Sequence, residues 1–306
     1  MNQPNEHDTH PRRRARKWVL GTVAILVVAV GSILGPRLYR AFSLLNAGEQ
    51  IDIGGRQIFI HCEGSGSPTV LLEHGLGSNG HEWQGVQGTI ADQTRVCWTS
   101  RAGMGFSDRV PAGTVRTAQD AVDDLTAVLV RAEVPGPYVL VGHSFGGYVV
   151  RLFAAQHPDD IVGVVLVDSS HQEQPAQLQS RVSAAAWDEV SVFFGADNPE
   201  NMDFTASASQ VRRAQSLGSL PLVVLEATEQ ATNTTEAGIS ETTATEIDTA
   251  MSSLWPELQA DLATLSTEGT HRVVTDSGHF IHEDNPTAVV AAITNVLSGV
   301  DTGVSD

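Results

Sequence analysis

The sequence has few cysteines, and few basic side chains outside its first 40 residues. Its 306 residues include only two cysteines, which excludes a disulfide-dense scaffold and a zinc site with four cysteine ligands. Lysine and arginine total 18 against 36 acidic residues, a net charge of -18 that argues against a nucleic-acid partner. We find no internal repeat. Apolar residues make up 41% of the chain, which is typical of a globular protein, and the length fits one large domain or two small ones.

Basic side chains are concentrated at the N-terminus. Residues 1–40 hold 7 of the 18 basic residues and 2 acidic ones, which leaves 11 basic and 34 acidic residues for the body. Residues 18–34 are an uncharged run of 17 residues, which as a helix would be just long enough to cross a bilayer at about 1.5 Å per residue. Because the larger basic cluster precedes it, we expect residues 1–17 in the cytoplasm and a single-pass anchor in the cell membrane at 18–35, with the body extracytoplasmic. A cleaved secretory signal is the alternative.

The body alternates short apolar strands with helices. Helices are expected at 117–132, where apolar residues recur at helical spacing, at 146–156, and from Pro286 onward. This alternation predicts an α/β fold with a mostly parallel sheet covered on both faces. Residues 226–253 are rich in threonine and glutamate and match neither pattern. Strands are expected at 51–54, 57–62, 69–73, 95–99, 138–141, 161–167, 220–225 and 272–274.

A serine motif lies between an expected strand and an expected helix. Residues 142–146 read Gly-His-Ser-Phe-Gly. In this context Gly-x-Ser-x-Gly is typical of a nucleophile elbow, whose strained backbone lifts the serine hydroxyl above the sheet. Side chains at positions 142 and 146 would collide in such a turn, and Gly147 leaves room for the helix to pack closely. Ser144 is therefore the predicted nucleophile.

A serine hydroxyl needs a base at neutral pH. His279 follows the last expected strand and precedes the last helix, which makes it the predicted general base. His143 flanks the serine and is expected to point away from it. His282 is interpreted as structural.

Five segments occur in the order and spacing of the α/β-hydrolase superfamily. The chain resembles this superfamily over roughly residues 50–298, and within it the small serine hydrolases with esterase- or haloperoxidase-like folds. The resemblance implies an α/β-hydrolase domain at 48–298, with an eight-stranded mostly parallel sheet, helices on both faces and a helical lid at 171–219, followed by a tail at 299–306. The segments are LEHGLG (72–77), SRAGMGFS (100–107), GHSFGG (142–147), VLVDSS (165–170) and SGHFIHEDNP (277–286).

The resemblance also implies an oxyanion hole formed by the N–H groups of Leu76 and Phe145. Two such donors stabilise a tetrahedral intermediate, and loss of one costs on the order of 3 kcal/mol. Residues 75–80 also match the dinucleotide pattern Gly-x-Gly-x-x-Gly. The expected acid at the end of the next strand is missing, although Arg101 there offers a partner for a 2′-phosphate. The oxyanion loop accounts for this segment, so we expect no cofactor, and no metal-ligand spacing is found.

The third member of the triad has several candidates. Family members usually carry Gly-x-x-Asp after the seventh strand, but here Gln230 stands where the aspartate would be. Asp168, at the end of the sixth strand, is the preferred acid, because some family members draw their acid from that position. Glu229 or Glu226 is the alternative, and the absence of an acid is a third possibility.

The two cysteines are expected to pair. In the strand order of this fold the strands that carry Cys62 and Cys97 are neighbours, so the resemblance implies a disulfide. Export to an oxidising compartment is consistent with it.

The predicted function is a membrane-anchored, cofactor-independent serine hydrolase of carboxylesterase type. Ser144 would attack a small-molecule acyl or ester substrate, and water would hydrolyse the acyl-enzyme. A non-catalytic ligand-binding or receptor module on the same fold is the alternative.

Overall fold

A computed structural model of the chain describes residues 48–214, 216–229 and 238–299. The predicted cytoplasmic segment at 1–17, the predicted anchor at 18–35 and residues 300–306 of the predicted tail lie outside these ranges. Within them, no helix combines the length and the apolar character that crossing a bilayer requires.

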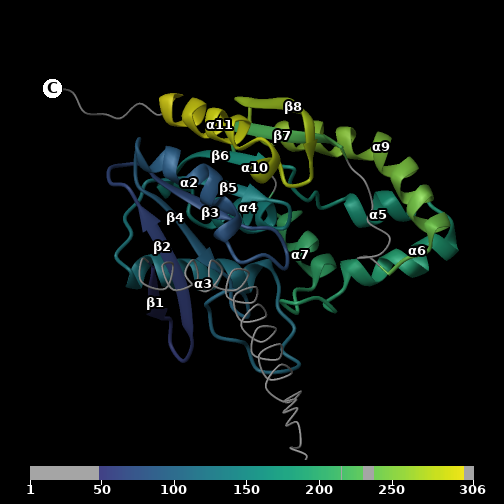
Figure 1. Ribbon diagram of the computed structural model, residues 1–306, viewed down its shortest axis with the longest axis horizontal. Coiled ribbons are helices and arrows are strands. Elements are labelled where there is room, and N and C mark those ends of the chain that lie inside the picture. The colour runs from purple at the N-terminus through teal and green to yellow at the C-terminus, as the bar shows by residue number, and fades with distance from the viewer. Residues whose placement is uncertain (1–47, 215, 230–237, 300–306) are drawn as a thin grey trace, which may run out of the picture. The chain divides into compact units, whose positions relative to one another are not determined.

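An eight-stranded sheet forms the centre of the body (Figure 1). Its strand order is β1-β2-β4-β3-β5-β6-β7-β8, in which β2 pairs antiparallel with β1 and β4 and the other neighbours are parallel. The predicted mostly parallel sheet is therefore confirmed. The strands are β1 (Glu49–Asp52), β2 (Gln57–Glu63), β3 (Thr69–Glu73), β4 (Val96–Ser100), β5 (Tyr138–His143), β6 (Ile161–Val167), β7 (Leu222–Glu229) and β8 (Gly269–Gly278).

Helices cover both faces of this sheet. Because β3 and β5 are buried along their whole length, they need such cover on each side. On one face α2 (Gln84–Ala91) packs against α11 (Pro286–Gly299), and on the other α3 (Ala118–Arg131) packs against α4 (Gly146–Gln156) (Figure 1). The helices expected from the apolar spacing and from Pro286 are therefore present.

A helical insert lies between β6 and β7, at the predicted lid residues 171–219. Its described helices are α5 (Gln174–Gln179), α6 (Ala184–Val190), the 3-10 helix η3 (Ser191–Phe194) and α7 (Phe204–Val211). A further helix, α9 (Glu241–Ala263), packs against α5 and α6 (Figure 1).

The sequence did not predict α9. Its threonines have low helix propensity, and Pro256 lies inside it. Tertiary packing overrides these local preferences, because α9 buries apolar side chains such as Ile247, Leu254 and Leu258.

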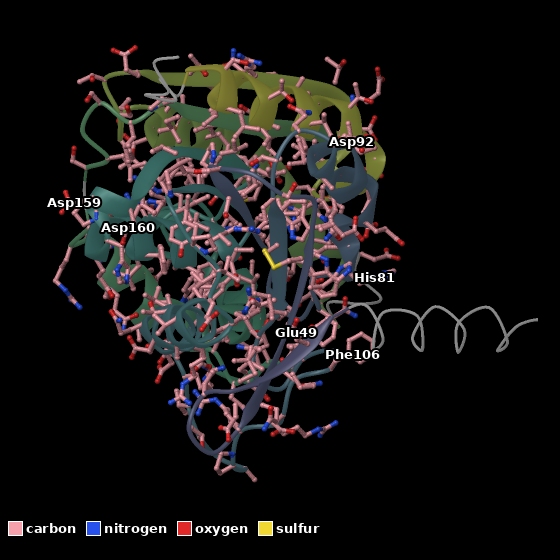
Figure 2. The ribbon with its side chains drawn as sticks, turned by 90° about the vertical axis from the view of Figure 1, so that its left-hand side faces the viewer. Glu49, His81, Asp92, Phe106, Asp159 and Asp160 are labelled. Carbon is pink, nitrogen blue, oxygen red and sulfur yellow. A yellow bond between two sulfur atoms is a disulfide. The ribbon has the colours of Figure 1, made fainter. Side chains whose placement is uncertain are left out.

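A disulfide joins the antiparallel strands β2 and β4. Cys62 and Cys97 lie directly opposite each other in the register, and their sulfur atoms are 2.04 Å apart (yellow bond in Figure 2). The predicted bridge is therefore present. It closes a separation of 35 residues, which in the chain-entropy model contributes about 3–4 kcal/mol to the free energy of unfolding.

Candidate active site

Ser144 lies in a strained turn between β5 and α4, as the motif predicts. Its φ is 49°, in the left-handed region that residues with a Cβ rarely adopt. The Ser144 N–H donates to the carbonyl of Val167 at 3.2 Å, and its own carbonyl accepts from the N–H of Ser170 at 3.0 Å. A Cβ at Gly146 would lie 2.4 Å from the carbonyl oxygen of Glu73, so only glycine fits there. Contacts on both sides therefore hold the strained serine in place.

The structure brings His279 and Asp168 together from two different strand ends. Nδ1 of His279 lies 2.6 Å from Oδ2 of Asp168. The other carboxylate oxygen accepts from the N–H of Ala227 at 2.9 Å and from Nε1 of Trp255 at 2.8 Å. Asp168 is fully buried, whereas the His279 side chain is 35% exposed. Because a carboxylate accepts, Nδ1 carries the proton and Nε2 is left as the acceptor, as a general base requires.

The rival acids are placed elsewhere. The last strand but one, β7, extends to Glu229, so Glu226 and Glu229 lie within it and not in a loop after it. The Glu226 carboxylate lies 2.6 Å from Nε2 of His271, and Glu229 is exposed. Of the three predicted acids, Asp168 is the one that the fold brings to His279.

The loop at residues 74–80, called here the β3 loop, passes beside Ser144. A Cβ built on Gly75 would lie 3.4 Å from the Cβ of Ser144, which brings the segment that contains Leu76 next to the serine. Phe145 precedes α4 as its N-cap residue, and N–H groups at a helix N-terminus have no partner within the helix. Both predicted oxyanion donors, Leu76 and Phe145, therefore belong to segments that adjoin Ser144.

Comparison with known proteins identifies the fold. Residues 68–268 match the model of a family described as alpha/beta hydrolase fold. The chain belongs to the α/β-hydrolase fold family. It is 28% identical over 243 residues to the uncharacterized protein YqjL of Bacillus subtilis (strain 168), which covers 77% of this chain and 86% of that protein.

A second curated protein is similar to this α/β hydrolase in sequence, and a solved structure is similar to it in fold. The 2-succinyl-6-hydroxy-2,4-cyclohexadiene-1-carboxylate synthase of Escherichia coli O1:K1 / APEC is 26% identical over 260 residues, covering 76% of this chain and 94% of the synthase. A thermophilic esterase from Thermogutta terrifontis has a similar structure, with a TM-score of 0.58 at 21% identity. The likeness covers 83% of this chain and 99% of the esterase.

In this α/β hydrolase a buried ion cluster, called here the Arg101 cluster, holds the β3 loop. It consists of Arg101 at the end of β4, Glu73 at the end of β3 and Glu200 in the helical insert. Nε and Nη2 of Arg101 each donate to Glu200 at 2.7 Å, and Nη1 donates to Glu73 at 2.6 Å. The two remaining donors bond the carbonyls of His74 at 2.7 Å and Gly75 at 2.8 Å. All five guanidinium N–H groups are therefore used.

The Arg101 cluster also bears on the dinucleotide alternative. Burial works against the charge of Arg101, but Glu200 and Glu73 outweigh it and raise its pKa. Glu200 in turn accepts from the N–H of Gly77 at 2.7 Å. Arg101, which the dinucleotide pattern would pair with a 2′-phosphate, is thus bonded to carboxylates of this chain, and so is an amide of the glycine-rich loop. Glu73 and Arg101 lie at the ends of the neighbouring strands β3 and β4, which is a sequence feature that could have indicated their pairing. No sequence feature indicated that Glu200 joins them.

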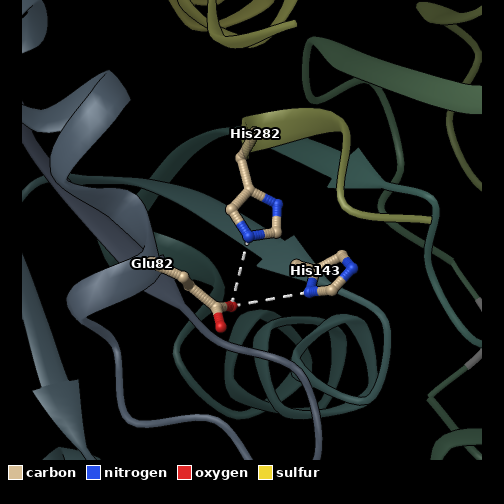
Figure 3. Close-up of side chains that lie close together, drawn as sticks. All are labelled: Glu82, His143 and His282. Carbon is tan, nitrogen blue, oxygen red and sulfur yellow. Dashed lines mark ion pairs between the residues drawn. The ribbon is translucent and has the colours of Figure 1, made fainter. Parts of the chain in front are cut away.

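A second buried group, called here the Glu82 cluster, consists of Glu82, His143 and His282 (Figure 3). Glu82 lies in the 3-10 helix η1 (His81–Trp83), His143 ends β5, and His282 lies in α10 (Ile281–Asp284). Burial lowers the pKa of His143 to about 4, so its imidazole is neutral at pH 7. His143 thus faces Glu82 through Nδ1, while its Nε2 lies 2.9 Å from the carbonyl oxygen of His279.

Aromatic side chains join the insert to the residue after Ser144. The ring of Phe204 lies 5.8 Å from that of Phe145 and 5.3 Å from that of Phe194, and Trp187 stacks on Phe194 at 5.7 Å. These aromatics form the core of the insert, whereas Phe193 is 42% exposed.

Proposed function

We propose that this chain is a membrane-anchored serine hydrolase that cleaves carboxylic esters through an acyl-enzyme on Ser144. The observation that carries the proposal is the 2.6 Å contact between His279 and Asp168 next to the strained turn of Ser144. A further contact supports the proximity of the two segments: Nε2 of His143, which precedes Ser144, lies 2.9 Å from the carbonyl oxygen of His279.

In the proposed reaction Nε2 of His279 removes the proton of the Ser144 hydroxyl while the oxygen attacks the ester carbonyl. Asp168 holds the imidazole by its Nδ1–H and stabilises the imidazolium that forms. The imidazolium then protonates the leaving alcohol, which leaves Ser144 acylated. His279 next deprotonates a water molecule that attacks the acyl-enzyme. As the second tetrahedral intermediate breaks down, the imidazolium returns the proton to Oγ of Ser144, and the acid is released.

The negative charge of each tetrahedral intermediate would be stabilised by the N–H groups of Leu76 and Phe145. Removal of one such donor typically costs about 10²–10³ in kcat. The Arg101 cluster supports this role, because it bonds the carbonyl of Gly75 and the N–H of Gly77, on either side of Leu76.

Membrane attachment rests on the sequence of residues 1–40. Their 17-residue uncharged run with basic flanks fits a single-pass anchor that leaves the body outside the cytoplasm. In cells that express the full chain, the protein should stay with the membrane fraction after carbonate extraction, and its body should be accessible to protease from the outer side. Release into the soluble fraction as a shortened chain would instead support a cleaved signal.

Ser144→Ala tests the catalytic assignment. On p-nitrophenyl esters the variant should lose at least 10³-fold in kcat, and a fluorophosphonate probe should label the wild type but not the variant. Equal rates for both proteins would remove Ser144 from the mechanism. A wild type that neither labels nor hydrolyses any ester in a series of graded chain length would favour the receptor alternative.

The choice of acid is tested by matched amide substitutions. Asp168→Asn keeps the shape of the side chain but favours the wrong imidazole tautomer, so we expect a loss of about 10⁴ in kcat. Glu226→Gln and Glu229→Gln should each stay near the wild-type rate. A large loss in either glutamine variant would assign the acid to β7.

A further inference from the structure

We propose that Glu82, His143 and His282 form a buried binding site for one divalent transition-metal ion, with zinc as the best match. Oε1 of Glu82 lies 3.5 Å from Nδ1 of His143 and 3.5 Å from Nε2 of His282 (dashed lines in Figure 3). The three ligand atoms all lie within 4.8 Å of one another. The side chains are 7%, 1% and 0% exposed respectively, so the site is a built interior feature and not a surface coincidence.

Three of the four ring nitrogens of the two imidazoles lack hydrogen bonds. Nδ1 of His143 and both ring nitrogens of His282 are buried with no hydrogen-bond partner in the described part of the chain. Buried polar groups in folded proteins nearly always have a partner, and an exception points to an ion or water. The 3.5 Å separations from Glu82 are longer than an N–H···O hydrogen bond. Figure 3 shows one nitrogen of each ring directed at the carboxylate.

The hydrogen bond on the far side of His143 decides which nitrogen carries its proton. Nε2 lies 2.9 Å from the carbonyl oxygen of His279, and a carbonyl oxygen can only accept. Nε2 therefore donates, and the neutral imidazole presents a bare lone pair at Nδ1 to Glu82. Two acceptors that face each other away from water repel, whereas a cation between them binds both. A metal-ligating histidine commonly donates its other N–H to a carbonyl in this way.

The donor set and its spacing indicate the kind of ion. Zinc binds imidazole nitrogen and carboxylate oxygen at about 2.0–2.1 Å, so its tetrahedral ligands lie roughly 3.3–3.4 Å apart. The two 3.5 Å separations are close to that value. Mg²⁺ and Ca²⁺ prefer sets of oxygen ligands, which two histidines do not provide. Three protein ligands leave a fourth position for water, and the other oxygen of Glu82 accepts from the hydroxyl of Ser78.

The ion would join three segments that are far apart in the sequence. Glu82 follows the β3 loop, His143 precedes Ser144, and His282 lies three residues after His279. Binding of the metal is independent of the proposed ester hydrolysis, so either can fail without the other.

The test measures zinc bound by the full chain. All variants are made in a parent protein, called here the background protein, that carries His7→Gln and His10→Gln, so that the N-terminal histidines cannot bind the metal. After EDTA treatment and removal of the chelator, the protein is equilibrated with ZnCl₂, desalted and analysed by mass spectrometry for metal. We expect one equivalent of zinc in this background and none in its Glu82→Gln and His282→Gln variants. His81→Gln, next to Glu82 but outside the cluster, is the matched control and should keep the full equivalent.

Circular dichroism shows whether each variant is folded. Equal zinc content in the background protein and in both folded variants would overturn the proposal, as would a background protein that retains no zinc. If a variant does not fold, the visible absorption spectrum of the background protein loaded with Co²⁺ tests the site instead. A strong band, typical of tetrahedral Co²⁺, would support the site. A weak spectrum, typical of octahedral Co²⁺, would overturn it. MgCl₂ in place of ZnCl₂ should leave the melting temperature unchanged, whereas zinc should raise it.

Discussion

The β3 loop is flanked by two buried charged clusters that are bonded very differently. In the Arg101 cluster every guanidinium N–H meets an oxygen atom at 2.6–2.8 Å. In the Glu82 cluster the carboxylate oxygen lies 3.5 Å from a ring nitrogen of each histidine, and three ring nitrogens lack hydrogen bonds. Burial of charge is costly in both places, but only the first cluster compensates for it with its own side chains. The comparison teaches that the charges of the Arg101 cluster depend on one another, whereas the Glu82 cluster leaves ring nitrogens unpaired, as the proposed metal site requires.

The largest loss of stability is expected from a substitution in the Arg101 cluster. Arg101→Met keeps much of the side-chain volume but leaves Glu73 and Glu200 as buried carboxylates without their cation. Breaking a buried ion pair from one side costs about 3–5 kcal/mol, so the urea midpoint of unfolding should fall strongly. Arg109→Met, at an exposed arginine nearby, should change the free energy of unfolding by less than about 0.5 kcal/mol. Similar stability in the two variants would mean that the Arg101 cluster contributes little.

An intermediate loss of stability is expected when the pH is lowered, because His74 is buried. Nδ1 of this buried imidazole bonds the carbonyl of Gly75 at 2.8 Å, and Nε2 accepts from the N–H of Arg101 at 3.3 Å. Burial first, and the charge of Arg101 second, lower its pKa from 6.5. The unfolded chain therefore binds a proton first, and stability is lost as the pH falls below about 6.5, by at most about 1.4 kcal/mol per pH unit.

Urea unfolding at pH 7.5, 6.5 and 5.5 measures this loss. His74→Gln replaces the titrating ring with an amide that can donate and accept at similar positions. Its stability should depend less on pH than that of the wild type. Parallel pH profiles for the two proteins would assign the acid sensitivity to other histidines.

The smallest change in stability is expected from a substitution in the Glu82 cluster when no metal is present. Glu82→Gln removes the buried charge, and the new amide N–H can donate to a ring nitrogen that has no partner, so the free energy of unfolding should change by less than about 1 kcal/mol. With zinc present, the wild type should gain stability and the variant should not. A loss of 3 kcal/mol or more without metal would show that the Glu82 cluster is as complete as the Arg101 cluster.

Much of the fold was predictable because its signals are local. Apolar runs between turn residues marked each of the eight strands, although β7 and β8 extend beyond the expected ranges. The expected helix at 117–132 was confirmed as α3, with Asp120 accepting from the N–H of Thr117 at 2.8 Å at its start. The long helix α9 was missed, because threonines and Pro256 oppose a helix until it packs against the insert.

The candidate site also has residues that the sequence predicted and residues that it did not. The resemblance favours Asp168 over Glu226 and Glu229 as the acid, and the fold brings Asp168 to His279. The residue that holds Asp168 from the other side, Trp255, lies on the unpredicted helix α9, so no local signal pointed to it.

By itself the amino-acid sequence determined the turn at Ser144, because a strand, a Gly-x-Ser-x-Gly sequence and a helix follow one another within a few residues. It also determined which strands carry the cysteines. Only the tertiary structure decided the partners of Arg101, His279 and His143, because Glu200, Asp168 and Glu82 are 99, 111 and 61 residues away from them along the chain. Contacts across such separations depend on the order of strands in the sheet and on the packing of the insert, which no local pattern of residues specifies.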